Sequence, residues 1–361
     1  MQKKILIFNP FGIGDVLFTT PLVRNLKNKI PGVSLSYMCN RRVAPIIKAG
    51  ALFDNVFVFE KDEWRALARQ SKVIFWKHLF AFFHAIRREK FDVVFDFSLN
   101  AQYGFFLMMA GIKKRIGFNF KKRGRFLTDK IDLPLGYTDK HVARWYLDSA
   151  RFMQLECEEY PLELHLPPQA YRQARDILKE YNISNAGPII AICPGSGDSW
   201  GGSADFKRWP VENFSQLCRK ILSELKCSVI ILGSQSEEGV CRKVLENAPG
   251  VVNLCGKLEL DVFCALVELC DMMVTNDGGP LHISQALHKK SVAFFGPVDE
   301  NVYGAYPDRS NVVTFVSAQD CRPCYRAFKF KGCAKDKRCL RDIDADKVFL
   351  AVKDLIGEVK P

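Results

Sequence analysis

The sequence lacks a hydrophobic run long enough to cross a membrane. Its first apolar stretch, Ile5–Phe8, stops at Pro10 and is far shorter than the apolar core of a signal peptide. The most apolar later stretch, Val73–Ile86, is interrupted by Lys77 and His84 and is shorter than the ~20 residues of a spanning helix. We therefore expect a soluble, cytoplasmic protein that is at most peripheral to a membrane.

The sequence also lacks the compositional extremes that mark non-globular chains. Hydrophobic residues make up 48% and charged residues 25% of its 361 positions, as in ordinary globular proteins. This balance excludes a disordered, collagen-like or coiled-coil chain. The length is too great for a small disulfide scaffold and is typical of two domains.

Acidic residues are scarce in the first part of the chain. Residues 1–150 hold 26 Lys and Arg against 12 Asp and Glu, a net charge of +14, whereas residues 151–361 hold 26 against 28, a net charge of −2. An excess of this kind indicates an anionic partner, such as a nucleic acid, a membrane surface or a phosphorylated substrate, or else a well-solvated basic surface. No nucleic-acid-binding module accompanies the charge, so we do not expect a nucleic-acid partner.

Strand-like apolar runs alternate with helix-like segments along most of the chain. Such alternation predicts an α/β fold of parallel sheets with helices on both faces. The expected strands are 4–8, 33–38, 55–59, 91–97, 115–118, 189–193, 228–232, 251–254, 272–275 and 291–295. The expected helices include 16–29, 64–90, 102–111, 139–154, 169–181 and 345–358.

The sequence pattern changes after residue 165, and this change divides the alternating strands and helices into two series. Pro167-Pro168 cannot continue a helix or a central strand, and the polar stretch 184–188 precedes the second series. The expected parts are a first domain 1–165, a linker 166–187, a second domain 188–320 and a cysteine-rich tail with a C-terminal helix, 321–361. Two doubly wound domains in tandem would face a cleft that binds ligands at the strand ends. The last helix is expected to pack back on the first domain.

The first strand is followed by the loop Gly12-Ile13-Gly14-Asp15, directly before a helix. The glycines allow a tight turn and close approach of a ligand to the backbone. The loop is not a dinucleotide fingerprint, because Leu17 occupies the third glycine position, and it has no Walker lysine. The Asp15 carboxylate is either a helix N-cap or, at a cleft rim, a general base.

Two further loops come at the ends of strands in the second half. The first is Pro194–Ser199, followed by Lys207-Arg208-Trp209-Pro210, and small residues followed by a cation suit a diphosphate. A flexible surface loop with solvated cations is the alternative. The second is Asp277-Gly278-Gly279-Pro280-Leu281-His282, in which the glycines expose amides at the positive end of a helix that begins near Pro280. The imidazole of His282 can add a donor there, or it is structural.

Four of the 13 cysteines are close together in sequence, at positions 321, 324, 333 and 339. Cys321-x2-Cys324 has the spacing of zinc ligands, and Cys333 and Cys339 would complete a tetrahedral thiolate site. Free thiols or a conditional disulfide are the alternatives. The other nine cysteines are scattered and indicate small buried side chains of a reducing compartment.

Taken together, the motifs at 12–17, 20–21, 207–210, 277–282 and 295–297, in this order, resemble the heptosyltransferase family of lipopolysaccharide glycosyltransferases (glycosyltransferase family nine). Residues 112–118 and 141–146 also resemble that family's first domain. The resemblance implies a GT-B fold of two Rossmann-like domains, with the acceptor on the first and the nucleotide sugar on the second. It further implies an inverting transfer that requires no metal cofactor, usually of heptose from ADP-heptose.

The resemblance also implies roles for individual residues. Asp15 would be the base that deprotonates the acceptor hydroxyl, and Lys207 would neutralise the departing diphosphate. The remaining donor-side residues would hold the diphosphate or the ribose, with Glu238 as an alternative for the ribose. They are Ser196, Glu237, Asp277, Gly278, Gly279 and His282.

On the acceptor side, a phosphorylated glycolipid and the inner membrane surface are the partners expected for the basic first domain. The residues assigned to them are Gly14, Arg115, Lys121 and Lys122. The phenylalanines of 75–83 suit either contact with a membrane interface or a long core helix. We expect a monomer at the cytoplasmic face of the membrane. The alternatives are a nucleotide-sugar epimerase of similar shape and a non-catalytic protein that binds nucleotides or acidic lipids.

Overall fold

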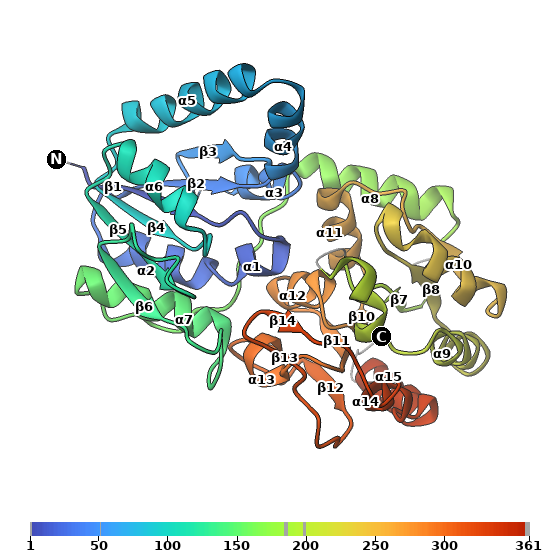
Figure 1. Ribbon diagram of the computed structural model, residues 1–361. Helices are drawn as coiled ribbons and strands as arrows, with labels where there is room; N and C mark the ends of the chain where they lie inside the picture. The colour runs from blue at the N-terminus through green and yellow to red at the C-terminus, as the bar shows by residue number, and fades with distance from the viewer. Residues whose placement is uncertain (1, 51, 184–186, 198–199, 358–361) are drawn as a thin grey trace. The chain divides into compact units, whose positions relative to one another are not determined.

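The computed structural model describes residues 2–50, 52–183, 187–197 and 200–357, which form two compact units, Met1–Tyr160 and Pro161–Pro361. Residues 184–186 of the expected linker, 198–199 of the loop after residue 193, and 358–361 lie outside the described residues. Within the described chain, no helix combines the length and the apolarity needed to cross a membrane. Figure 1 shows the elements of each unit.

The first unit is built on a six-stranded parallel sheet with the order β3-β2-β1-β4-β5-β6, the strand order of a Rossmann fold. The strands are β1 (Lys4–Phe8), β2 (Ser34–Cys39), β3 (Asn55–Val58), β4 (Val93–Asp96), β5 (Lys114–Asn119) and β6 (Asp129–Asp132). The central strand β1 is an uninterrupted apolar run because helices cover both of its faces. The edge strand β6 was not predicted.

Helices cover both faces of the first sheet. Figure 1 shows α5 and α6 on one face and α2 and α7 on the other. The helices are α1 (Ile13–Leu17), α2 (Thr20–Lys29), α3 (Ala44–Ala49), α4 (Lys61–Gln70), α5 (Lys72–Glu89), α6 (Ala101–Met109), α7 (Val142–Asp148) and the 3-10 helix η1 (Ser149–Met153). The prediction of a single long helix over 64–90 is therefore wrong. The helix is interrupted at Ser71, whose hydroxyl accepts a hydrogen bond from the Ile74 amide and caps α5.

The second unit repeats the same topology. Its six parallel strands have the order β12-β11-β10-β7-β8-β9, which is again the Rossmann order when the strands are numbered within the unit. They are β7 (Ile189–Cys193), β8 (Ser228–Ile231), β9 (Val252–Asn253), β10 (Met272–Asn276), β11 (Lys290–Phe295) and β12 (Val312–Val316). The edge strand β12 was not predicted. A short antiparallel pair, β13 (Tyr325–Arg326) and β14 (Lys329–Phe330), follows.

The helices of the second unit also lie on both faces of its sheet. They are η2 (Gly201–Lys207), α8 (Pro168–Glu180), α9 (Val211–Glu224), η3 (Gln235–Glu237), α10 (Glu238–Glu246), α11 (Leu260–Leu269), α12 (Gly279–Ala286), α13 (Glu300–Tyr303), α14 (Arg338–Arg341) and α15 (Ala345–Gly357). The helix α8 lies within the expected linker, yet it packs on α11, where the Tyr171 hydroxyl donates to Glu268.

The last helix belongs to the core of the second unit. Val348, Phe349 and Val352 of α15 are buried in one cluster with α9 and α10, and Lys220 of α9 pairs with Asp346. The expectation that this helix packs back on the first domain is therefore wrong. Its apolar face packs against α9 of its own unit.

Candidate active site

The candidate donor site lies at one edge of the second sheet. The strands β8, β7 and β10 are parallel neighbours, so the loops that follow them leave the sheet at the same edge. These loops carry Glu237, Ser196 and Asp277 respectively. The 3-10 helix η2, which ends at Lys207, joins them.

A buried asparagine connects three of these segments. Asn276, the last residue of β10, is fully buried, and its amide nitrogen donates to the carbonyl oxygens of Pro194 and Gly195, 2.9 Å from each. Its amide oxygen accepts the backbone N–H of Trp209 at 2.8 Å. Because Trp209 follows Lys207 by two residues and Asn276 precedes Asp277, this one side chain sets the position of the lysine relative to the aspartate.

Lys207 and Asp277 form a buried ion pair. The ammonium nitrogen lies 2.8 Å from Oδ2 of Asp277, and only 7% and 6% of the two side chains are exposed. The Lys207 ammonium also lies over the indole ring of Trp200, 5.2 Å from its centroid. A lysine held in this way offers a fixed positive charge at the strand ends.

Glu237 holds the loop after β7 in place through hydrogen bonds. One carboxylate oxygen accepts the Gly197 amide at 2.7 Å, and the other accepts the amide and the hydroxyl of Ser234 at 2.9 and 3.0 Å. A Cβ at position 195 would lie 1.9 Å from this carboxylate, so a larger residue there would displace the Glu237 side chain from its present position. The neighbouring Glu238 contacts Gln235 and Arg242 instead.

Ser196 and Gly278 mark where two of the loops meet. The Ser196 hydroxyl donates to the Ala204 carbonyl of η2 at 2.9 Å. A Cβ on Gly278 would come within 3.2 Å of the Ser196 carbonyl oxygen, so the glycine allows this close approach. Gly279 is the first residue of α12, and the amides of that first turn face the strand ends.

His282 is buried in the first turns of α12. Burial and the nearby charge of Lys207 lower the pKa of its imidazole to about 3, and a hydrogen bond with Gln285 opposes that shift. The imidazole is therefore neutral at physiological pH, so it can offer this candidate site a neutral hydrogen-bonding group.

In the first unit, Gly14 and Asp15 lie in α1, directly after β1, and Asp15 is half-buried. The Asn9 side chain donates to the Asp15 carbonyl at 3.1 Å and so holds the turn. Burial raises the pKa of the Tyr37 and Tyr146 hydroxyls, and the charge of Asp15 adds a smaller contribution in the same direction, which places the carboxylate near both phenols.

A second carboxyl group lies at the same edge of the first sheet, and the sequence analysis missed it. Asp96 ends β4, in register with Phe8 of β1, and accepts the Ser98 amide at 3.0 Å. Burial raises the pKa of Asp96 to about 6. The only sequence signal was an aspartate at the end of a buried strand, a position typical of sites in doubly wound folds.

The three basic residues assigned to the acceptor differ in their surroundings. The Arg115 guanidinium donates to the carbonyls of Phe126, Ile112 and Lys113, which is a structural arrangement, and burial lowers its pKa. Lys121 and Lys122 are exposed in the loop after β5, and the Lys121 ammonium lies 5.0 Å from the centroid of the Phe120 ring.

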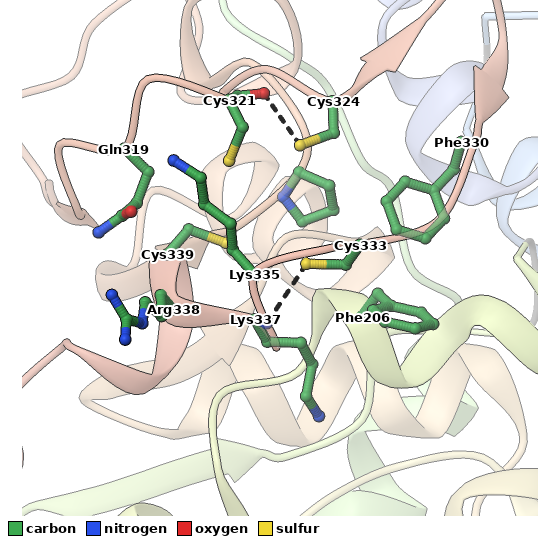
Figure 2. A pocket seen from close by; sticks show the side chains of 11 residues that line it. Phe206, Gln319, Cys321, Cys324, Phe330, Cys333, Lys335, Lys337, Arg338 and Cys339 are labelled. Atoms are coloured by element: carbon green, nitrogen blue, oxygen red, sulfur yellow. Dashed lines mark hydrogen bonds between the residues drawn. The ribbon is translucent and has the colours of Figure 1, made fainter.

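The four clustered cysteines surround one pocket. Figure 2 shows the sulfur atoms of Cys321, Cys324, Cys333 and Cys339 directed into the same space. The Lys337 amide donates to the Cys333 sulfur at 3.3 Å. Nevertheless, across residues 2–50, 52–183, 187–197 and 200–357, no group of three or more His, Cys, Asp or Glu side chains is arranged to hold a metal ion.

The cysteine segment also supports the helix that carries Lys207. Tyr325 and Phe330, from β13 and β14, each pack with their rings 5.0 Å from the Trp200 ring, and Phe330 lies equally close to Phe206. Lys337 pairs with Asp205 of the same helix. The segment after β12 is therefore part of the wall of the candidate donor site.

Comparison with known proteins places this architecture in a family. Residues 79–334 match the family model described as glycosyltransferase family 9 (heptosyltransferase). That match covers more than half of the chain, so the chain belongs to glycosyltransferase family 9, as the sequence motifs predicted. The protein is therefore a glycosyltransferase with a GT-B-type fold of two Rossmann-like units.

Three relatives illustrate the similarity. The chain is 22% identical over 336 residues to lipopolysaccharide heptosyltransferase 2 of Escherichia coli K12, which covers 87% of this chain and 88% of that one. Its fold matches that of a family 9 glycosyltransferase from Veillonella parvula, with a TM-score of 0.79, 19% identity and coverage of 99% and 97%. It also matches E. coli heptosyltransferase WaaC, solved with ADP, with a TM-score of 0.71, 18% identity and coverage of 98% and 99%.

Proposed function

We propose that this protein transfers heptose from ADP-heptose to a phosphorylated lipopolysaccharide acceptor, with inversion at the anomeric carbon. The observation that carries the proposal is the buried Lys207–Asp277 pair, held at the strand ends by Asn276. A fixed cation beside exposed helix amides suits a nucleotide diphosphate. The relatives are named as lipopolysaccharide heptosyltransferases, and one was solved with ADP.

On the donor side, the Lys207 ammonium would bind the diphosphate and stabilise the charge that develops as ADP leaves. The amides of Gly278 and Gly279, with the neutral His282, would complete the diphosphate site, and Asp277 would keep Lys207 in place. Ser196 and Glu237 would shape the loop on which the donor lies, with Glu237 as the ribose ligand. Because Lys207 supplies the positive charge, the reaction would need no metal ion.

On the acceptor side, Asp15 would take the proton of the attacking hydroxyl. The acceptor oxygen then bonds to the anomeric carbon, the bond from that carbon to the phosphate oxygen breaks, and ADP leaves with the electron pair. The amide of Gly14 and the exposed Lys121 and Lys122 would contact the acceptor and its phosphates, with Arg115 supporting their loop. All these residues come from one chain, so the proposal needs no second copy.

The test is an incubation of the purified protein with ADP-heptose and heptose-deficient lipopolysaccharide, followed by ADP quantification and mass spectrometry of the glycolipid. We expect ADP release and a heptose adduct only when both substrates are present. Turnover of ADP-heptose without an acceptor would instead indicate an epimerase or hydrolase, and binding without turnover would indicate a non-catalytic protein.

The four cysteines would take up a structural zinc ion. Four thiols on one pocket, with an amide donating to one sulfur, are the donor set that zinc prefers. The sulfurs would have to move closer together than in the described residues, and the ion would rigidify the wall beside Trp200. Elemental analysis should find zinc in the wild type and none in Cys321→Ser/Cys324→Ser. A metal-free wild-type protein would contradict this.

A further inference from the structure

The helix α5 of the first unit carries both buried and exposed apolar side chains. Its inner side is core: Leu79, Phe83 and Ile86 are buried among residues of β1, β4 and α6, and the Phe83 ring stacks on Phe106 at 4.9 Å. Phe75 and Phe82 are partly buried against the same cluster. These residues account for the part of the phenylalanine-rich stretch that stabilises the fold.

The outer side is exposed although it is apolar. Val73, Trp76 and Phe80 have 78%, 47% and 66% of their surface exposed, and Ile74 beside them has 45%. Their spacing of three and four residues places Val73, Trp76 and Phe80 in one stripe along the helix. The rings of Trp76 and Phe80 lie 5.9 Å apart, so the two aromatic groups form one continuous apolar strip.

Basic side chains lie beside the strip. Lys72 and Lys77 are exposed on either side of it, Arg69 at the end of α4 is exposed, and Arg87 and Arg88 follow at the far end of the helix. The segment from residue 71 to residue 88 contains no aspartate or glutamate. A tryptophan and a phenylalanine among lysines and arginines are typical of helices that lie in the interface of an anionic bilayer.

We propose that this strip docks the first unit on an anionic phospholipid surface, with Trp76 and Phe80 inserted among the headgroups and Lys72 and Lys77 against lipid phosphates. The helix would lie in the plane of the interface. It does not span, because the lysines and histidines interrupt its apolar sequence and its inner side is already packed. The charge complementarity between these basic side chains and lipid phosphates favours a lipid surface over an apolar protein partner, which would not require basic residues beside the strip.

The inference deepens the proposed function, because a lipid-linked acceptor lies in such a surface. The two are nevertheless tested separately. Vesicle binding is measured without donor or acceptor, and transfer is measured with acceptor dispersed in detergent. A failure of docking therefore leaves the transfer result intact, and a failure of transfer leaves the docking result intact.

The experiment is co-sedimentation of the full chain with phosphatidylcholine vesicles and with vesicles that also contain phosphatidylglycerol. We expect binding to the anionic vesicles only. The variant Trp76→Ser/Phe80→Ser should weaken the binding about tenfold or more, since two large apolar groups no longer leave water. The variant Lys72→Glu/Lys77→Glu should weaken it by at least about 25-fold, at roughly fivefold per lysine.

The matched control is Leu135→Ser/Leu350→Ser, which removes two apolar side chains of comparable exposure, 65% and 57%, outside the strip. It should bind vesicles like the wild type. Thermal melts of all variants should coincide, because none of the substituted residues is buried. Equal binding to neutral and anionic vesicles, unchanged binding by the Trp76→Ser/Phe80→Ser variant, or no vesicle binding by the wild type would each overturn the inference.

Discussion

The Lys207 ammonium and the Asp277 carboxylate lie 2.8 Å apart in a site from which water is almost excluded. Burying two charges is costly unless each compensates the other, so the pair exists because the surrounding loops hold both side chains in place. A diphosphate that reaches this point meets a lysine whose charge is already desolvated and oriented. Most of what the donor site is expected to do follows from this relationship.

The first prediction concerns the aspartate of that pair. Replacing Asp277 by Asn leaves the Lys207 charge buried without a counter-charge, so Asp277→Asn should lose about 3–5 kcal/mol in free energy of unfolding. Added ADP should then raise the melting temperature of the variant more than that of the wild type, because its phosphates supply the missing negative charge. Equal shifts in differential scanning fluorimetry would contradict the assignment of Lys207 to the diphosphate.

The second prediction concerns Asn276. Asn276→Ala leaves the buried Trp209 amide and two carbonyls without partners and should destabilise the protein by roughly 2–4 kcal/mol. ADP affinity, measured by calorimetry, should fall because Lys207 loses its position. The control Asn213→Ala removes a hydrogen bond to Ile343 in the same unit and should leave ADP affinity unchanged. Loss of affinity in both variants would mean a general structural effect.

The third prediction concerns the proposed base. Asp15→Asn keeps the shape of the side chain but cannot accept the proton, so transfer to the acceptor should fall by a factor of about 10²–10⁴. Affinity for ADP should stay at the wild-type value, because the residue belongs to the other unit. Steady-state rates at saturating donor give the comparison, and an Asp15→Asn variant of normal activity would remove this residue from the mechanism.

The fourth prediction is a pH dependence of stability. The pKa of His282 is about 3 in the folded protein and about 6.5 in an unfolded chain, so the unfolded state binds the extra proton between these values. The free energy of unfolding should therefore decrease as the pH falls below about 6.5, by up to about 1.4 kcal/mol per pH unit from this group. Urea unfolding of His282→Gln between pH 7 and pH 5 should show a weaker decrease.

The wild type, unfolded in urea over the same pH range, is the reference for that experiment. A His282→Gln variant with the full wild-type pH dependence would show that another group causes it.

The sequence alone was sufficient to predict the features that depend on residues close together in the chain. The buried strands β1, β7 and β10 are largely apolar and are followed by glycine-containing loops, so both Rossmann-like units could be predicted from them. The edge strands β6 and β12 were missed because one carries charged residues and the other is half-exposed, without the continuous burial that marks a central strand.

Long-range roles could not be predicted. Asn276 forms hydrogen bonds with backbone groups that lie 67 to 82 positions away in the chain. Nothing in its local sequence indicates which backbone groups these are. Arg115 looked like an anion ligand because it is a cation in a basic run, but folding brings three carbonyls to it. The outer strip of α5 could not be predicted either, because the sequence pattern does not distinguish the exposed Trp76 and Phe80 from the buried phenylalanines of the core.

The most direct test of the central claim is a calorimetric titration of ADP into the wild type and into Lys207→Met, with Lys243→Met, an exposed lysine of α10, as the control. A charge-assisted contact of this kind contributes about 1.5–3 kcal/mol, so affinity should fall by a factor of about 10–100 in Lys207→Met and stay unchanged in Lys243→Met. Equal ADP affinity in all three proteins would contradict the account.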